Sequence, residues 1–182
     1  AIPDDEVLSF LDKRRGKLEA VTVTGGEPTL QKDLEKFLGE LKNMQYLLKV
    51  DTNGSNPDIL STLIDKQLVD YIAMDIKGPL KKYGRMVAAN VDVSRIRRSI
   101  QLITTSGIEY EFRTTVVRSQ LDLGDLVSMA KIIKPARLYV LQPFVARKTL
   151  DSAFLSETSF APEEFSTIRE VLEKNGLSVV VR

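Results

Sequence analysis

The stretch from Val21 to Leu30, VTVTGGEPTL, decides how this sequence is interpreted. Its first four residues are β-branched, which is typical of a strand. Gly25 and Gly26 follow, and two glycines let the backbone approach another group closely. Glu27 then adds one carboxylate, and Pro28 restricts the turn. The stretch therefore predicts a strand that ends in a polar turn whose backbone amide and carbonyl groups are accessible.

Strand-like and helix-like segments alternate on both sides of this stretch. Strand-like runs predict six strands, at residues 20–24, 47–54 (a strand with its turn), 69–78, 110–117, 137–144 and 177–182. Apolar residues at helical spacing lie before and between them, and the first helix is expected to start within residues 2–6 and to be closed by Gly16. Strands that are nearly continuously apolar, rather than alternating, suit a parallel sheet covered by helices. We therefore predict an α/β fold in a single domain, residues 1–182, built from six strand–helix units.

Composition excludes several classes of protein. The chain has 182 residues, of which 43% are hydrophobic and 28% charged, with a net charge of +1. This balance gives no reason to expect nucleic acid or an anionic membrane as a partner, and the short basic groups at 13–15 and 95–98 are interpreted as solvated surface. No apolar run is long enough to span a membrane, and no signal peptide is visible, so a cytoplasmic protein is expected.

The sequence contains no cysteine and no histidine. A disulfide, a thiolate-bound zinc or iron–sulfur site, a cysteine nucleophile and a Ser-His-Asp triad are therefore excluded from these residues. Nucleotide-binding fingerprints of the forms GxGxxG and GxxxxGK[ST] are also absent, which argues against Rossmann and P-loop sites. Chemistry in this chain rests on carboxylates, Lys, Arg, hydroxyls, amides, the backbone or a bound cofactor.

Five of the predicted strands finish in polar residues. They are Thr24-Gly25-Gly26-Glu27, Asp51-Thr52-Asn53, Asp75-Ile76-Lys77, Arg113-Thr114-Thr115 and Gln142. Because the carboxyl ends of parallel strands lie on one face, we expect a site there. Each member also has a structural interpretation: Asn53-Gly54 as a turn, Asp75 with Lys77 as a surface ion pair, Arg113 as a charge facing solvent.

The charges at these strand ends indicate a type of ligand. Three carboxylates, Glu27, Asp51 and Asp75, would repel one another unless cations balance them. Lys77 and Arg113 supply only two. A ligand with both an ammonium and a carboxylate group fits such a mixed surface. A hard cation held between Asp51 and Asp75 is a further hypothesis.

Four ordered segments, TGGEPTLQ, VDTNGSNP, VDYIAMDIKGP and EFRTTVV, resemble those of radical S-adenosylmethionine (SAM) proteins. The likeness is to the activating enzymes of glycyl-radical enzymes, and most to the type that activates anaerobic ribonucleoside-triphosphate reductase. It covers nearly the whole chain. The resemblance implies a TIM-like partial barrel, (β/α)6, which agrees with the six units counted above.

The resemblance also implies roles for the strand-end residues. Gly25, Gly26 and Glu27 would bind the amino group of the methionine moiety of SAM, with Pro28 stiffening the turn. Lys77 and Arg113 would be catalytic. The remaining cofactor-binding residues would be Asp51, Thr52, Asn53, Asp75 and Gln142.

One hallmark of the family is missing from this sequence. The resemblance implies a Cys-x3-Cys-x2-Cys loop after a first strand, which ligates a [4Fe-4S] cluster, and no cysteine is present. The helix beginning IPDDEVLSF resembles the one that follows this loop. We therefore expect the first strand and the cluster loop to be missing from this chain, with the cluster ligands outside it. The alternative is a degenerate barrel that has lost its cluster.

The resemblance implies a reaction and its partners. Reductive cleavage of SAM would generate a radical on a glycine of a partner enzyme, and a flavodoxin or ferredoxin would donate the electron. The chain alone is expected to be inactive. Three alternatives stay open: another radical SAM modification, a cluster-less ligand-binding barrel that regulates a partner, and an aldolase or lyase using Lys77 as a Schiff-base nucleophile. The segment 145–160 is expected to be a loop over or beside the site.

Overall fold

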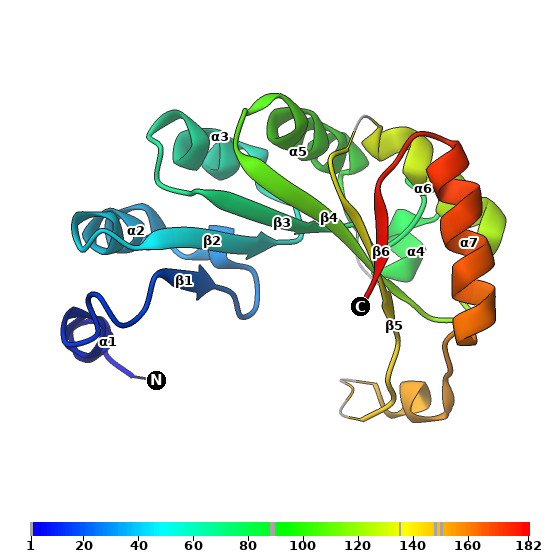
Figure 1. Cartoon of the computed structure of the whole chain (residues 1–182), viewed down its shortest axis with the longest axis horizontal. Helices are drawn as coiled ribbons and strands as arrows, with labels where there is room; N and C mark the ends of the chain where they lie inside the picture. The colour runs from blue at the N-terminus through cyan, green and yellow to red at the C-terminus, as the bar shows by residue number, and fades with distance from the viewer. Residues whose placement is uncertain (1, 88–89, 135, 148, 150) are drawn as a thin grey trace. The chain divides into compact units, whose positions relative to one another are not determined.

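The computed structural model describes residues 2–87, 90–134, 136–147, 149 and 151–182, so the predicted loop at 145–160 is described except at positions 148 and 150. Six strands alternate with helices along the chain (Figure 1). The strands are β1 (Ala20–Val23), β2 (Leu47–Thr52), β3 (Tyr71–Asp75), β4 (Glu109–Val116), β5 (Tyr139–Pro143) and β6 (Val179–Val181). All six strands predicted from the sequence are confirmed.

Seven α-helices and two 3-10 helices connect or precede the strands in the described part of the chain. The α-helices are α1 (Asp4–Asp12), α2 (Leu34–Asn43), α3 (Pro57–Asp65), α4 (Tyr83–Met86), α5 (Val93–Thr105), α6 (Leu123–Ile133) and α7 (Pro162–Lys174). The 3-10 helices are η1 (Pro28–Leu30) and η2 (Ser152–Ser156). The sequence did not predict α4, η1 or η2, because such short segments cannot display a repeated apolar spacing.

Helix α1 ends earlier than the sequence predicted. It stops at Asp12, because the next amide groups bond three residues back, from Arg14 to Leu11 and from Arg15 to Asp12. Gly16 lies in the turn that follows, at φ +71°. The same kind of glycine follows α5 and α7 closely, at Gly107 and Gly176, and both have positive φ as expected after a helix end.

The strands form one sheet in the order β1-β2-β3-β4-β5-β6. The pairs β1–β2, β2–β3, β4–β5 and β5–β6 are parallel, with registers such as Val23 beside Val50 and Thr115 beside Gln142. Sequential order with a helix in each connection is the βα repeat that the sequence predicted. The α/β fold class is therefore confirmed.

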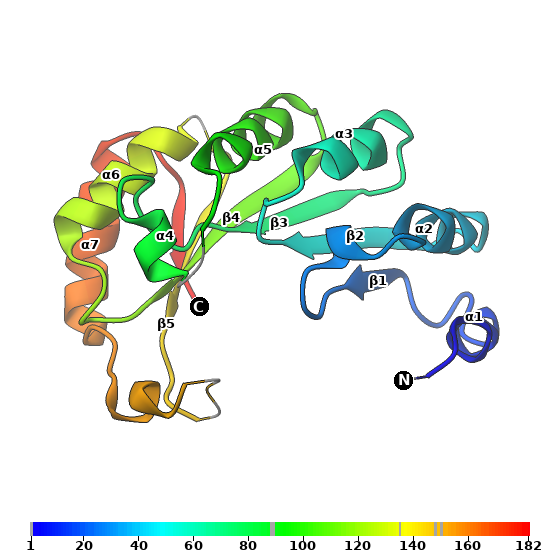
Figure 2. The ribbon, with the colours of Figure 1, turned by 180° about the vertical axis from the view of Figure 1, so that it is seen from behind.

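Contacts divide the chain into two compact units. The first comprises Ala1–Met74 and Arg98–Tyr110, and the second comprises Asp75–Arg97 and Glu111–Arg182. In the first, Leu38, Leu41, Val50, Leu60 and Leu63 are fully buried between the strands and their helices. The fully buried residues of the second unit include Phe112, Tyr139, Leu141, Met129 and Leu172. Helices α6 and α7 lie side by side in both views (Figure 2).

No helix in the described ranges combines the length and the apolar character that crossing a membrane requires.

Candidate functional site

In the first unit, the residues after β1 make a tight polar turn. Gly25 has φ +138°, a conformation that residues with a Cβ rarely adopt, and both Gly25 and Gly26 are exposed. Glu27 caps the short helix η1, in which Pro28 occupies the first position. The Glu27 side chain turns inward, so only 9% of the residue is exposed. The glycines keep the backbone accessible while the carboxylate is held inside.

Four donors, none of them charged, bind the Glu27 carboxylate. Oε1 accepts hydrogen bonds from the Thr29 amide at 3.2 Å, the Thr29 hydroxyl at 2.6 Å and the Thr52 hydroxyl at 2.8 Å. Oε2 accepts one from the Asn53 amide at 2.6 Å. This set joins the end of β1 to the end of β2 and fixes the orientation of the carboxylate. Thr29 is part of the cluster although the sequence did not single it out.

A second layer holds these donors in place. The Gly54 amide donates to the Thr52 hydroxyl at 3.0 Å, and the Ser99 hydroxyl donates to the Gly54 carbonyl at 2.7 Å. The Asn56 side-chain amide donates to the Thr29 carbonyl at 2.9 Å. Asn53-Gly54 is therefore a turn, as one interpretation of the sequence proposed, and it also delivers the Asn53 amide to Glu27.

Gly54 is required at this turn for two reasons. Its φ is +74°, which favours glycine, and a Cβ built there would lie 2.0 Å from the Met74 methyl carbon. Met74 itself is fully buried. A larger residue would force either the turn or the packed methionine to move, and the Asn53 amide would move with the turn.

The cluster around Glu27 carries a negative charge that no Lys or Arg side chain of the described residues neutralises by an ion pair. Four donors aimed at one carboxyl group suit the ionised form, which only accepts hydrogen bonds. In the part of the chain that the structure describes, Glu27 makes no ion pair with Lys or Arg. A buried carboxylate without a counter-charge is unfavourable. The site is thus built to gain from a cationic group, such as an ammonium.

A cavity of about 270 Å³ opens beside this turn. Thr24, Gly26, Glu27 and Pro28 line it together with Asp4 and Asp33, which belong to the starts of α1 and α2. Three of its lining residues are acidic and none of them is basic. The cavity therefore extends the preference of the Glu27 cluster for a cation.

Asp51 lies on β2 within the same unit. Its Oδ1 is 3.6 Å from the Lys49 ammonium, and 17% of its side chain is exposed. The Lys49 ammonium also lies 5.4 Å from the centre of the Tyr71 ring. Thr52 and Asn53, the next two residues, belong to the Glu27 cluster, so two of these three predicted residues contribute directly to it.

In the second unit, Asp75 binds two cations. Its Oδ2 accepts a hydrogen bond from the Lys77 ammonium at 2.9 Å, and its Oδ1 accepts one from the Arg113 Nε at 2.9 Å. The three side chains together carry a charge of +1. Arg113 is only 15% exposed, so it does not simply face solvent, whereas Lys77 is 40% exposed. The predicted ion pair of Asp75 with Lys77 is present and extends to Arg113.

Backbone and hydroxyl contacts position this second cluster. The Ile76 amide donates to the Arg113 carbonyl at 2.8 Å, and the Thr114 hydroxyl donates to the Ile76 carbonyl at 2.8 Å. The Tyr139 hydroxyl donates in turn to the Thr114 hydroxyl at 2.8 Å, and burial raises the pKa of Tyr139. Residue 76, between Asp75 and Lys77, is thus fixed to β4 through both its amide and its carbonyl.

Tyr83 of α4 also belongs to this second cluster, and the sequence missed it. Its hydroxyl accepts a long hydrogen bond, 3.4 Å, from the Lys77 amide. Burial raises the pKa of Tyr83 to about 12, and the negative charge of Asp75 acts in the same direction against the opposing effect of that amide. Tyr83 therefore stays neutral at physiological pH.

The structure brings the predicted residues together in two groups. Glu27, Thr52 and Asn53 share contacts in the first unit, and Asp75, Lys77 and Arg113 share contacts in the second. Gln142 lies on β5, half-buried, beside Thr115. The predicted cation between Asp51 and Asp75 pairs residues of different units and stays a prediction. Within the described ranges, no group of three or more acidic, histidine or cysteine residues could hold a metal.

The sequence matches the radical SAM superfamily over residues 2–131. A candidate glycyl-radical enzyme activating enzyme of Methanocaldococcus jannaschii is 31% identical over 169 residues, which are 90% of this chain and 70% of that protein. The 7-carboxy-7-deazaguanine synthase of Thermococcus kodakarensis is 28% identical over 77% of this chain, and there the chain spans 54% of the relative's length.

Solved structures share the fold at low sequence identity. A domain of the pyruvate-formate lyase-activating enzyme from Bacteroides vulgatus superimposes with a TM-score of 0.69 at 17% identity, over 90% of this chain and 98% of that domain. Streptococcus suis SuiB bound to S-adenosylmethionine superimposes with a TM-score of 0.75 at 10% identity, over 100% of this chain and 44% of SuiB.

The superfamily match covers well over half of the chain, and its start lies only two residues before α1. SAM and an iron–sulfur cluster are the cofactors of this superfamily. The chain belongs to the radical SAM superfamily, and within it resembles proteins of the glycyl-radical enzyme activating type.

Proposed function

We propose that this chain is the SAM-binding part of a radical SAM enzyme that forms a glycyl radical on a partner enzyme. One observation carries the proposal: the buried carboxylate of Glu27 is fixed by four uncharged donors and, among the described residues, lacks a counter-charge. The ammonium of the methionine moiety of SAM supplies that charge. Gly25 and Gly26 keep the adjacent backbone accessible, so the ligand can approach it.

The second cluster has a different role in the proposal. Asp75 orients Lys77 and Arg113 by binding both, and the surplus positive charge favours an anionic group of the ligand or substrate. The Lys77 ammonium is engaged in an ion pair rather than lying in an apolar pocket, which is unlike a Schiff-base lysine. This observation argues against the aldolase hypothesis.

The residues present fit the two cofactors unequally. The Glu27 cluster fits the amino acid end of SAM. No residue of this sequence can supply a thiolate to a cluster, because the sequence has no cysteine. When both are bound, SAM and the cluster supply the radical that removes a hydrogen atom from a partner's glycine. We therefore expect these residues alone to be inactive in SAM cleavage while retaining affinity for SAM.

We propose an anaerobic ribonucleotide reductase as the partner enzyme, because the four ordered segments resemble that type of activating protein. A small one-electron donor protein, such as a flavodoxin or ferredoxin, completes the proposal. A second candidate function is modification of a small molecule, which the similarity to a deazaguanine synthase favours. A glycyl-radical signal in the electron paramagnetic resonance spectrum of the reductase, dependent on the full gene product, would distinguish the two.

The direct test measures SAM binding to this chain by isothermal titration calorimetry. Glu27→Gln keeps the shape but removes the charge, and a charge-assisted hydrogen bond lost to an ammonium should weaken affinity by roughly tenfold or more. Glu19→Gln is the matched control, because Glu19 precedes β1 at its opposite end and is exposed. Unchanged affinity in a folded Glu27→Gln variant would contradict the assignment.

A further inference from the structure

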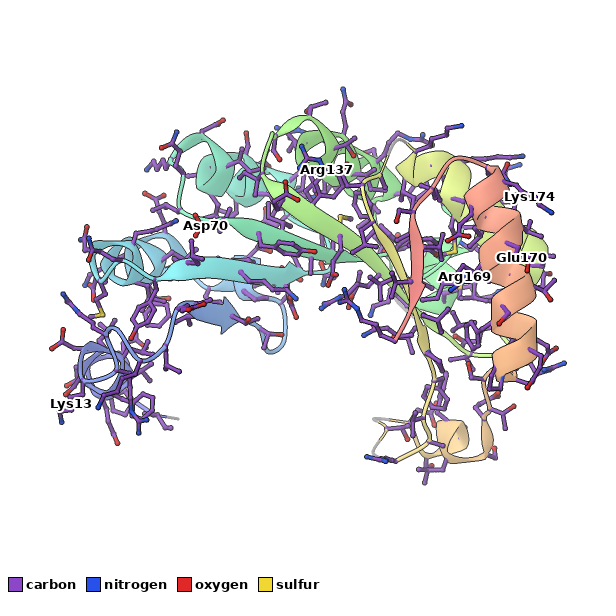
Figure 3. All side chains as sticks on the ribbon, in the orientation of Figure 1. Lys13, Asp70, Arg137, Arg169, Glu170 and Lys174 are labelled. Atoms are coloured by element: carbon purple, nitrogen blue, oxygen red, sulfur yellow. The ribbon has the colours of Figure 1, made fainter. Side chains whose placement is uncertain are left out.

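A second cavity, of about 310 Å³, lies in the second unit beside the edge strand β6. Its lining is mainly apolar: Pro143, Phe160, Pro162, Phe165 and Val181. Arg169 of α7 adds a guanidinium group at the same cavity, and Figure 3 shows this side chain on the side of α7 nearest β6. The cavity shares no lining residue with either cluster described above.

The aromatic wall of this cavity is held in place. The Phe160 and Phe165 rings meet edge to face, with 6.1 Å between their centres. The Arg118 guanidinium lies 5.0 Å from the centre of the Phe160 ring and forms an ion pair with Glu164 at 2.6 Å. The Arg118 amide also donates to the Thr158 carbonyl. These contacts fix the end of the segment 145–160, so the cavity is preformed.

The neighbouring strand presents backbone groups at its open side. The Ser178 carbonyl accepts from the Tyr139 amide, and the Arg182 amide donates to the Leu141 carbonyl, so both residues direct these groups toward β5. Because strand geometry alternates with a period of two, the amide and carbonyl groups of Val179 and Val181 point away from β5. Among the described residues, no strand pairs with that side of β6.

Arg169 retains capacity to bind an anion. The Arg169 Nε lies 3.8 Å from the Glu173 Oε1, which is beyond hydrogen-bond distance, and both side chains are about half exposed. A guanidinium has five donors and binds a carboxylate well when two of them are used together. The cavity thus combines an apolar interior, a row of backbone groups and a cation.

We propose that this cavity and the open edge of β6 bind an extended peptide segment of a partner protein. The segment adds as a strand beside Val179 and Val181, places one apolar side chain in the cavity, and directs a carboxylate on the same face toward Arg169. Addition of a strand to a sheet edge provides affinity through the backbone, and the cavity provides specificity. The proposal is independent of SAM binding and of the reaction proposed above.

The test uses fluorescein-labelled peptides of ten residues, alternating threonine and valine, with one central leucine. Two places after the leucine, and therefore on the same face, the peptides carry aspartate, asparagine or lysine. Fluorescence anisotropy measures their binding to the chain. We expect the aspartate peptide to bind roughly fivefold more tightly than the lysine peptide, because opposite charges meet at Arg169.

Two pairs of variants decide the matter. Arg169→Glu should reverse the preference, so that the lysine peptide binds more tightly than the aspartate peptide. Lys174→Glu makes the same charge change on the same helix and should leave the preference unchanged, because Lys174 does not line the cavity. Ser166→Trp places an indole in the cavity and should weaken all three peptides by roughly tenfold, whereas Thr167→Trp, one residue further and outside the lining, should not.

Three outcomes would overturn the proposal. If the Arg169→Glu variant still preferred the aspartate peptide, the peptide carboxylate would not contact residue 169. Unchanged binding in Ser166→Trp would place the peptide elsewhere. Loss of self-association in Ser166→Trp, measured by sedimentation velocity without peptide, would identify a second copy of this chain as the occupant. Thermal unfolding followed by circular dichroism confirms that each variant is folded.

Discussion

The two clusters at strand ends hold their central carboxylates in opposite ways. Glu27 in the first unit is 9% exposed and is bound by two hydroxyls and two backbone amides, all uncharged. Asp75 in the second unit is more exposed, with 28% of its side chain accessible, and is bound by the cations of Lys77 and Arg113. The first cluster has a charge of −1 and the second of +1.

The two clusters show that a protein can orient a carboxylate with or without neutralising its charge. Uncharged donors orient a carboxylate without neutralising it, so the Glu27 cluster keeps its attraction for a cation. Cationic donors do both, so the Asp75 carboxylate serves to position two side chains that carry the net charge. The comparison predicts that the first cluster depends on hydrogen-bond geometry and the second on ion pairs.

The largest effect on stability is expected from Glu27→Ala. It leaves two hydroxyls and two amides without their acceptor, and buried polar groups that lose partners destabilise by about 1–3 kcal/mol each. Partial replacement by water reduces the sum, so we expect the free energy of unfolding to fall by about 3 kcal/mol. Urea denaturation measures it, with Glu19→Ala as the control. A loss equal to that of the control would show that the donors find other acceptors.

A smaller effect is expected from Arg113→Met. Arg113 is mostly buried, and removing it leaves Asp75 with Lys77 alone in a partly desolvated place, so the free energy of unfolding should fall by about 1–2 kcal/mol. The same measurement in a Glu27→Ala background tests whether the two clusters are independent. If the two losses in unfolding free energy add within about 0.5 kcal/mol in the double variant, the clusters are independent. A larger departure from the sum would show that they are energetically coupled.

Lys77→Met should change stability still less. Lys77 is 40% exposed, and exposed ion pairs contribute about 0.5 kcal/mol because water and side-chain entropy offset the attraction. High salt screens such a pair, so the difference from wild type should shrink at about 1 M sodium chloride. The effect of Glu27→Ala should persist at that salt concentration. If salt reduced the effects of both variants equally, ion pairs would contribute equally to the two clusters, contrary to this prediction.

The smallest effect at neutral pH concerns Tyr83. Burial raises its pKa to about 12, whereas an unfolded tyrosine titrates near its ordinary value of 10.0. The unfolded state therefore loses its proton first as pH rises, and this contribution to stability falls between about pH 10 and pH 12. Tyr83→Phe should reduce the late part of an ultraviolet titration of the tyrosines but not abolish it, because burial also raises the pKa of Tyr139. If instead an early step disappeared, Tyr83 would be accessible to solvent.

Much of the fold could be predicted from the sequence, because the strands are apolar runs and the helices have regular apolar spacing. In β2, for example, Leu48, Val50 and Thr52 are buried at alternate positions, and the sequence located this strand within 47–54, together with the turn that follows it. The short helix α4 and the early end of α1 could not be predicted, since backbone bonding within a few residues decides them.

The sequence predicted which residues form the site, but not which contacts their side chains make. Strand ends showed that Glu27, Thr52 and Asn53 belong near one another. The inward turn of Glu27, and the part of Thr29 in holding it, depend on side-chain direction, which spacing does not specify. The sequence Glu-Pro-Thr was a usable signal, because proline favours the first position of a helix and the polar residue before it can act as the cap. Tyr83 gave no such signal.

The division of the chain into two units has a consequence for how the protein is made. The chain passes from one unit to the other after Met74, after Arg97 and after Tyr110. A ribosome that has released Asp75–Arg97 has therefore begun the second unit before Arg98–Tyr110 has completed the first. Neither unit can be separated from the other by a single cleavage, and the first becomes complete only after Tyr110 has been synthesised.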